Sequence, residues 1–171
     1  NWVHVTCERS KFKIASLPKD NFPDIPSIES GTVALPAQTL RYMVSSCIFA
    51  ITQEESRYTL NGALMMIHPG SITCVTTDGH RLAFIARNVD IAGVEGETRA
   101  LIPRKTLVEL SKLAPEELES IEFANTENHL FFTIGERQLI SRVLNGQFPN
   151  YEMVIPKEND KRVVLSRLEF S

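Results

Sequence analysis

Leu35-Pro-Ala-Gln-Thr-Leu-Arg41 and Ile102-Pro-Arg-Lys-Thr-Leu-Val108 share one pattern, in which an aliphatic residue, a proline and a Thr-Leu pair keep the same spacing. Each stretch follows a short apolar run that is typical of a strand, at residues 32–35 and 98–102. Proline is tolerated at the first position of a helix, so Pro36 and Pro103 are each predicted to begin one. The sequence therefore predicts the same strand-to-helix connection twice.

The segments that follow the two connections also correspond. The first predicted helix has an apolar stripe at helical spacing, formed by Leu40, Val44, Cys47 and Ile51, and the second runs through Leu113. Three predicted strands follow each helix, at 58–67, 71–77 and 81–88 and again at 119–123, 130–134 and 139–143. The Asp78-Gly79 pair between two apolar runs predicts a type I′ hairpin turn. The middle of the chain is thus a duplicated β-α-β-β-β unit of the α+β class, with two helices on one face and antiparallel sheets on the other.

The flanking segments indicate further domains of the same kind. Residues 2–5 and 11–14 alternate like strands, and a proline-rich stretch follows at 17–26. Phe22-Pro-Asp24 recurs as Phe148-Pro-Asn150, 126 residues later.

The run from Arg162 to Leu165 resembles the strand at 32–35. We therefore expect residues 1–17 to end one domain, 18–30 to be a linker, 31–151 to form a complete domain, and 152–171 to be a linker and the start of another. The chain does not begin with Met, which suggests a piece of a longer protein. Tandem domains of this length suit an array or a ring.

Composition narrows the class of protein. The formal net charge is −3 and charged residues make up 23% of the chain, so a protein that grips nucleic acid by overall charge is excluded, and any DNA contact must use a local basic surface. The longest apolar stretch is too short to cross a membrane. Cys7, Cys47 and Cys74 fit neither a disulfide framework nor a zinc site, so we expect three reduced, buried thiols in a cytoplasmic protein.

Four motifs in this order resemble the middle domain of the bacterial DNA sliding clamp family, the beta subunit of DNA polymerase III. They are Arg57-Tyr-Thr-Leu-Asn-Gly62, Thr76-Thr-Asp-Gly-His-Arg-Leu-Ala83, Ile102-Pro-Arg-Lys105 and Asn145-Gly-Gln-Phe-Pro-Asn-Tyr151. The likeness extends from about Phe12 to Lys161. It implies a non-catalytic DNA replication processivity factor, without a cofactor, in which two subunits of three domains each encircle duplex DNA. The family's subunit contacts lie in its first and third domains, so we expect this chain alone to be a monomer.

The resemblance also implies a peptide pocket on the outer surface. It would take short linear motifs, typically a glutamine followed by leucine and an aromatic residue, from the polymerase III catalytic subunit and the clamp loader. An apolar floor, a methionine that adapts its shape and a glycine that admits a peptide backbone suit this role. The family positions correspond to Leu60, Thr77, Gly79, His80, Arg81, Leu82, Pro149, Met153 and Val154. Thr59 departs from the pattern, because many relatives carry an aromatic residue there.

The predicted helices carry the candidate DNA-facing residues, which are Arg41, Arg104, Lys105 and Lys112. Lys105 and Lys112 are seven residues apart and so lie on one helical face. Such a face is often merely solvated, but in a clamp it would line the hole and contact phosphates without reading bases.

Two other functions stay open on the sequence alone. Asp78 and His80 could serve a small hydrolase, although no catalytic motif or metal-ligand spacing accompanies them. The chain could also be a peptide-binding β-rich adaptor without DNA contact, in which case Lys105 and Lys112 would not face the same way as Arg41.

Overall fold

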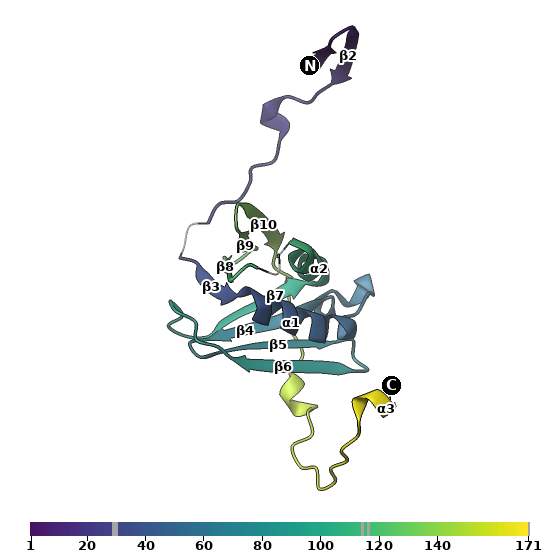
Figure 1. Cartoon of the computed structure of the whole chain (residues 1–171), viewed down its shortest axis with the longest axis vertical. Coiled ribbons are helices and arrows are strands. Elements are labelled where there is room, and N and C mark those ends of the chain that lie inside the picture. The colour runs from purple at the N-terminus through teal and green to yellow at the C-terminus, as the bar shows by residue number, and fades with distance from the viewer. Residues whose placement is uncertain (29–30, 114, 116, 171) are drawn as a thin grey trace.

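The computed structural model describes residues 1–28, 31–113, 115 and 117–170. Its N-terminal strands β1 (Trp2–Cys7) and β2 (Ser10–Ala15) form an antiparallel hairpin that projects away from the rest of the chain (Figure 1). A short 3-10 turn, η1 (Lys19–Asn21), lies in the connection to the main body.

The duplicated unit predicted from the sequence is confirmed. Its first copy contains β3 (Val33–Pro36), α1 (Ala37–Cys47), η2 (Ile48–Ala50), η3 (Glu55–Leu60), β4 (Gly62–His68), β5 (Ser71–Thr77) and β6 (Leu82–Asn88). Its second copy contains β7 (Thr98–Pro103), α2 (Arg104–Leu113), β8 (Ser120–Asn125), β9 (His129–Ile134) and β10 (Arg137–Arg142). The turn η4 (Tyr151–Met153) and the short helix α3 (Arg167–Phe170) follow.

Each copy gives its first strand to the other copy's sheet. The two sheets have the orders β10-β9-β8-β3 and β6-β5-β4-β7, and all pairings are antiparallel. The strand-to-helix junctions are tied in the same way, because the Ala37 N–H donates to the Glu119 carbonyl at 2.9 Å and the Arg104 N–H donates to the Asn61 carbonyl at 3.0 Å. The two halves are therefore related by a pseudo-twofold, and neither sheet can form from one half alone.

The prolines end strands instead of occupying the first helical position. Pro36 is the last residue of β3, opposite Ser120, and has extended φ and ψ of −60° and 116°. Pro103 ends β7 opposite Gly62 in the same way. Proline at the end of an edge strand costs little, because its missing N–H would not serve the ladder there.

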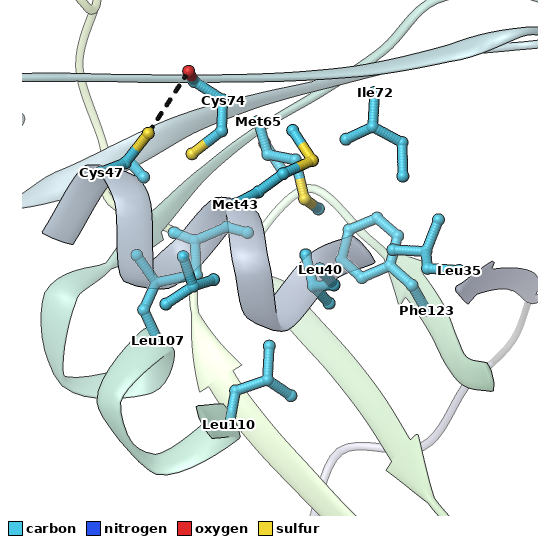
Figure 2. Packing of buried hydrophobic residues seen from close by; sticks show 14 of the residues in the cluster. Leu35, Leu40, Met43, Cys47, Met65, Ile72, Cys74, Leu107, Leu110 and Phe123 are labelled. Atoms are coloured by element: carbon cyan, nitrogen blue, oxygen red, sulfur yellow. Dashed lines mark hydrogen bonds between the residues drawn. The ribbon is translucent and has the colours of Figure 1, made fainter. Parts of the chain in front are cut away.

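A hydrophobic core lies between the two helices and the two sheets (Figure 2). Leu40 and Met43 of α1 and Leu110 of α2 are nearly inaccessible to solvent, at 3%, 0% and 2%, and pack in one cluster with Ile72 of β5 and Phe123 of β8. The ring of Phe123 lies 5.1 Å from that of Phe132, which adds a tilted aromatic contact. Because both halves contribute to this core, it fixes the helices side by side on one face of the domain.

Gly62 marks a close approach between the two halves. A Cβ at this position would collide with the carbonyl oxygen of Ile102 and with the side chain of Leu144. Only glycine lets β4 start this close to the end of β7.

Some local predictions from the sequence are wrong. Leu60 ends the 3-10 segment η3 instead of lying in a strand, and α1 ends at Cys47, before Ile51. Residues 162–165 form no strand, because no partner strand lies beside them within the described part of the chain. Cys7 is exposed, since no second layer covers the β1–β2 hairpin within the described residues, whereas Cys47 and Cys74 are buried as expected.

Candidate functional site

The helix face of the domain exposes lysines from α2. Helices α1 and α2 contact each other and lie on the same side of the domain (Figure 1). Lys105 and Lys112 are both exposed on α2, and the Lys112 ammonium donates to Glu109 at 2.9 Å. Exposed pairs of this kind are weak, so Lys112 stays available to an anion.

Arg41 and Arg104 are less accessible than the two lysines. Arg41 is half-buried on α1, beside the buried Leu40. Arg104 is the half-buried first residue of α2, and its Nε is shielded from solvent without a hydrogen-bond partner among the described residues. Of the four predicted DNA-facing residues, the lysines are thus the most open to a large ligand.

The loop between β5 and β6 is built around Asp78. Thr77 pairs with Leu82, which leaves four loop residues, so the predicted two-residue type I′ turn is wrong. One Asp78 oxygen accepts from the backbone N–H groups of His80 at 2.9 Å and Arg81 at 3.0 Å, and the other accepts from Arg81 Nε at 3.0 Å. The backbone donors from Arg81 and His80 lower the pKa of Asp78 to about 2. The carboxylate is therefore ionised at neutral pH and holds the loop in place.

Gly79 is the one loop residue that needs the left-handed region, with a φ of +90°. Its N–H donates to the Thr77 hydroxyl at 3.1 Å, and an added Cβ would lie 3.2 Å from the Arg57 guanidinium. Arg57 also donates to the Asp78 carbonyl at 3.2 Å, which ties η3 to the loop. The motif containing Leu60 and the motif containing Gly79 thus lie together.

Thr77 and Leu82 face away from the helices. Thr76, the preceding residue, donates from its hydroxyl to the Cys47 carbonyl at 2.8 Å and so points toward α1. Successive side chains of a strand alternate between faces, which places Thr77 and its partner Leu82 on the opposite face, together with Phe84.

His80 and Arg81 lie at the end of the domain beside the C-terminal end of α1. The Arg81 guanidinium sits 5.6 Å from the ring centre of Phe49, an exposed residue of η2. Both loop residues line a hollow of about 450 Å³ with Phe49, Gln53 and Arg104.

The segment after β10 crosses the face of the sheet opposite the helices. The Tyr151 ring lies 6.0 Å from that of Phe84, and its hydroxyl donates to the Met66 sulfur at 3.8 Å. Pro149 lines a hollow of about 790 Å³, whose apolar wall includes Leu64, Leu101 and Leu144.

Met153 and Val154 follow Tyr151 and are 82% and 67% exposed. Met153 lines an adjoining hollow of about 490 Å³, which shares Asn150 and Glu152 with the hollow that Pro149 lines. The structure thus brings Thr77, Leu82 and Pro149 to one face, and Arg57 joins the 3-10 segment that ends at Leu60 to the loop. His80 and Arg81 line the hollow beside Phe49, and Met153 lines the one that adjoins Pro149.

Asp78 and His80 do not form an acid-base pair. Asp78 accepts from the backbone of His80, and within the described residues no hydrogen bond joins their side chains. That part of the chain also contains no group of three potential metal ligands, and none of its helices is long and apolar enough to span a membrane.

Sequence reasoning missed several side chains that shape these surfaces. Tyr151 and Arg57 belong to motifs that were singled out, yet their contacts join segments far apart in the chain and have no local signal. Phe49 was not singled out from the sequence; it lies in η2, after the end of α1, and is 56% exposed.

The chain is similar to proteins of one known family. The family described as "DNA polymerase III beta subunit, central domain" matches residues 34–150. The chain is 33% identical over 167 residues to the beta sliding clamp of Pseudomonas aeruginosa, covering 95% of this chain and 44% of that protein. It is 35% identical over 169 residues to that of Chlamydia pneumoniae, covering 98% and 45%.

Solved structures of sliding clamps have the same fold as this chain. A sliding clamp from Bartonella birtlesii bound to griselimycin superposes with a TM-score of 0.84 at 33% identity, over 99% of this chain and 46% of that one. The DNA polymerase III subunit beta from Pseudomonas aeruginosa gives 0.82 at 31%, over 93% and 44%. The chain spans a little under half the length of these relatives. From the family match over residues 34–150, and from a duplicated α+β fold that agrees with solved clamps, it follows that this chain belongs to the DNA polymerase III beta subunit family, the bacterial sliding clamps.

Proposed function

We propose that this chain is the central part of a DNA replication processivity factor, a ring that encircles duplex DNA and tethers DNA polymerase to it. A tether raises the effective concentration of the polymerase at its template and needs no catalytic group. Membership of the sliding clamp family supports this function. The ring is a homodimer of the full-length protein and acts in the cytoplasm.

The observation that carries the proposal is the helix face with its exposed Lys105 and Lys112. Lysines on flexible stems attract phosphates without recognising bases, which suits a ring that slides. The overall net charge of −3 fits as well, because a strongly basic ring would hold DNA in place.

The test uses the full-length protein loaded onto nicked circular DNA. Lys105→Ala together with Lys112→Ala should shorten the dwell time of the ring and the length of DNA made per polymerase binding event. Gln38→Ala with Ser45→Ala, at exposed positions of α1, is the matched control. An unchanged dwell time in the lysine variant would show that α2 does not face DNA.

The surface opposite the helices supports a second role, which is binding the linear motifs of the polymerase III catalytic subunit and the clamp loader. Leu82 and Pro149 lie on that face, and Tyr151 anchors the segment that carries Pro149. A flexible motif loses conformational entropy on binding, so its affinity depends on a few buried anchors. The pocket is formed by Leu60, Thr77, Gly79, His80, Arg81, Leu82, Pro149, Met153 and Val154.

Titration with a peptide that contains a glutamine, a leucine and a phenylalanine tests this role. Backbone chemical shifts should move at Leu60, Gly79, Leu82 and Val154, and Leu82→Asp should abolish the change. Leu165→Asp, the same substitution in the exposed C-terminal tail, should have no effect. Shifts confined to α2 would contradict the assignment.

The divisions expected along the chain belong to the same proposal. Residues 1–17 end the preceding clamp domain, 18–30 form a linker, 31–151 form the middle domain, and 152–171 lead into the next domain. Since the ring contacts then lie outside it, the chain alone is a monomer. A tight dimer seen by light scattering in dilute solution would contradict this division.

A further inference from the structure

Arg87 lies on the helix side of the domain, next to α1. Ala83 and Ile85 of the same strand, β6, pack into the core beneath the helices. The alternation of side chains along a strand places Arg87 on that same face. Its guanidinium carbon sits 4.8 Å from the ring centre of Tyr42, an exposed residue of α1.

The charge of Arg87 is not neutralised by a carboxylate within the described part of the chain. By contrast, Arg57, Arg81, Arg99 and Lys112 each pair with an acidic side chain. Arg87 donates from one Nη to the carbonyl of Ala86 at 3.2 Å, which leaves its other donors open. It is therefore an exposed cation that is held in one place by an aromatic ring and not by an anion.

We infer that Arg87 is a further phosphate contact on the DNA-facing surface, positioned by the ring of Tyr42. This inference rests on the proposed function. The exposed positions of α1 are Gln38, Tyr42 and Ser45, none of which is charged, so α1 lacks an exposed cation of its own. Arg87 supplies that cation from the neighbouring strand.

A guanidinium stacked on an aromatic ring suits a phosphate better than a free lysine does. Its planar donors match two phosphate oxygens at once, and the cation–π contact orients them before DNA arrives. Less side-chain entropy is then lost on binding. Tyr42 is thus a positioning residue, and Arg87 is the residue that contacts DNA.

The salt dependence of duplex binding by this chain tests the inference, because each phosphate contact contributes about 0.9 to the slope of log K against log salt concentration. Arg87→Gln should lower the slope by about 0.9 and weaken binding about tenfold at 50 mM salt. Arg87→Lys should keep the slope, because the charge remains. Arg99→Gln is the matched control, since Arg99 flanks Ala100 of the core, lies on the opposite face of the same sheet and pairs with Glu97.

Variants of Tyr42 separate positioning from folding. Tyr42→Phe keeps the ring and should bind like the unmodified chain. Tyr42→Leu should weaken binding several-fold while the slope stays unchanged, because the cation is still present but less ordered. An equal loss of DNA affinity in Tyr42→Phe and Tyr42→Leu would show that the ring of Tyr42 does not position Arg87.

A Lys105→Ala, Lys112→Ala variant, measured in parallel, distinguishes failure of the Arg87 contact from failure of the proposed function. If its slope falls while that of Arg87→Gln does not, the DNA-facing surface stands and the role of Arg87 is refuted. If neither slope falls, the proposed function of this face fails first. If Arg87→Gln leaves DNA binding intact but weakens an acidic protein partner in the full-length protein, Arg87 is a protein contact and the inference is wrong.

Discussion

The two halves of the central domain, β3 to β6 and β7 to β10, have the same backbone plan but expose different side chains. Their strand-to-helix junctions make equivalent hydrogen bonds, and each helix buries a leucine four residues after its proline, Leu40 in α1 and Leu107 in α2. The positions that α1 exposes as Gln38 and Ser45 correspond to Lys105 and Lys112 in α2. The duplication thus preserves what the core requires and leaves the exposed helix positions free to differ.

The largest expected effect concerns the core that the halves share. Phe123→Ala in the second half should lower the free energy of unfolding by about 3–5 kcal/mol, and Met65→Ala in the first half by about 2–5 kcal/mol. Both side chains belong to one cluster, so each variant should unfold in a single transition at a lower denaturant midpoint. Two separate transitions, followed by circular dichroism and by fluorescence, would show that the halves are independent.

The next largest effect is expected when the exposed lysines of α2 are introduced at the equivalent positions of α1. Gln38→Lys with Ser45→Lys should steepen the salt dependence of duplex binding by nearly 2, at about 0.9 for each added contact. The equivalent positions on α2 already carry lysines, which is why a gain is expected. The control is Gln147→Lys with Asn150→Lys, which adds the same charge at two exposed residues of the hollow opposite the helices, measured by the same salt titration. An equal gain in the control would mean that total charge matters and the helix face does not.

These comparisons show how much the sequence could predict. The Pro-x-x-Thr-Leu repeat predicted the duplicated unit and both helices, because helix starts and apolar periodicity are local properties. The repeat could not predict that β3 pairs with β8 and β7 with β4. Strand pairing depends on contacts between residues far apart in the chain, such as Val33 and Phe123.

The candidate sites show the same limit. The lysines of α2 were identified from their helical spacing, and the structure exposes both. The contact of Arg87 with Tyr42 was missed, because it joins a strand to a helix and neither residue belongs to a motif. His80 and Arg81 were grouped with Pro149 by resemblance, and the hollow that they line with Phe49 was not predicted from the sequence.

A smaller effect is expected at the loop between β5 and β6, which contrasts with the two-residue turn between β9 and β10. Backbone donors lower the pKa of Asp78 to about 2, from an ordinary value of 3.8. The ionised carboxylate therefore stabilises the folded loop above about pH 3.8, and this contribution is lost as the pH falls toward 2.

Amide chemical shifts of Gly79, His80 and Arg81 should titrate with a midpoint near pH 2. Asp78→Asn keeps an acceptor oxygen but should remove this titration. The amides of Gly135 and Glu136, in the corresponding turn of the second half, serve as an internal reference. A midpoint near 3.8 at Gly79 would refute the hydrogen-bonded arrangement.

The smallest expected effect is a difference in reactivity among the three cysteine thiols. Cys47 donates to the Cys74 carbonyl at 3.8 Å within the core, and the contact with Cys47 together with burial raises the pKa of the Cys74 thiol (Figure 2). In the native chain a thiol reagent should modify only Cys7 at once. Cys74 should react last, as the mass of each labelled peptide would show. Simultaneous labelling of all three would mean that the first half opens readily.

The exchange of first strands also has a consequence for synthesis of the protein. β3 emerges from the ribosome early, but its partner β8 follows about 90 residues later, as the separation of Thr32 and Glu122 indicates. At translation rates of about 5 to 20 residues per second, β3 waits roughly 5 to 18 s with an unpaired edge. During that interval the nascent chain exposes a strand that can pair with another chain. The proline at the end of β3, which lacks an N–H donor, limits such pairing.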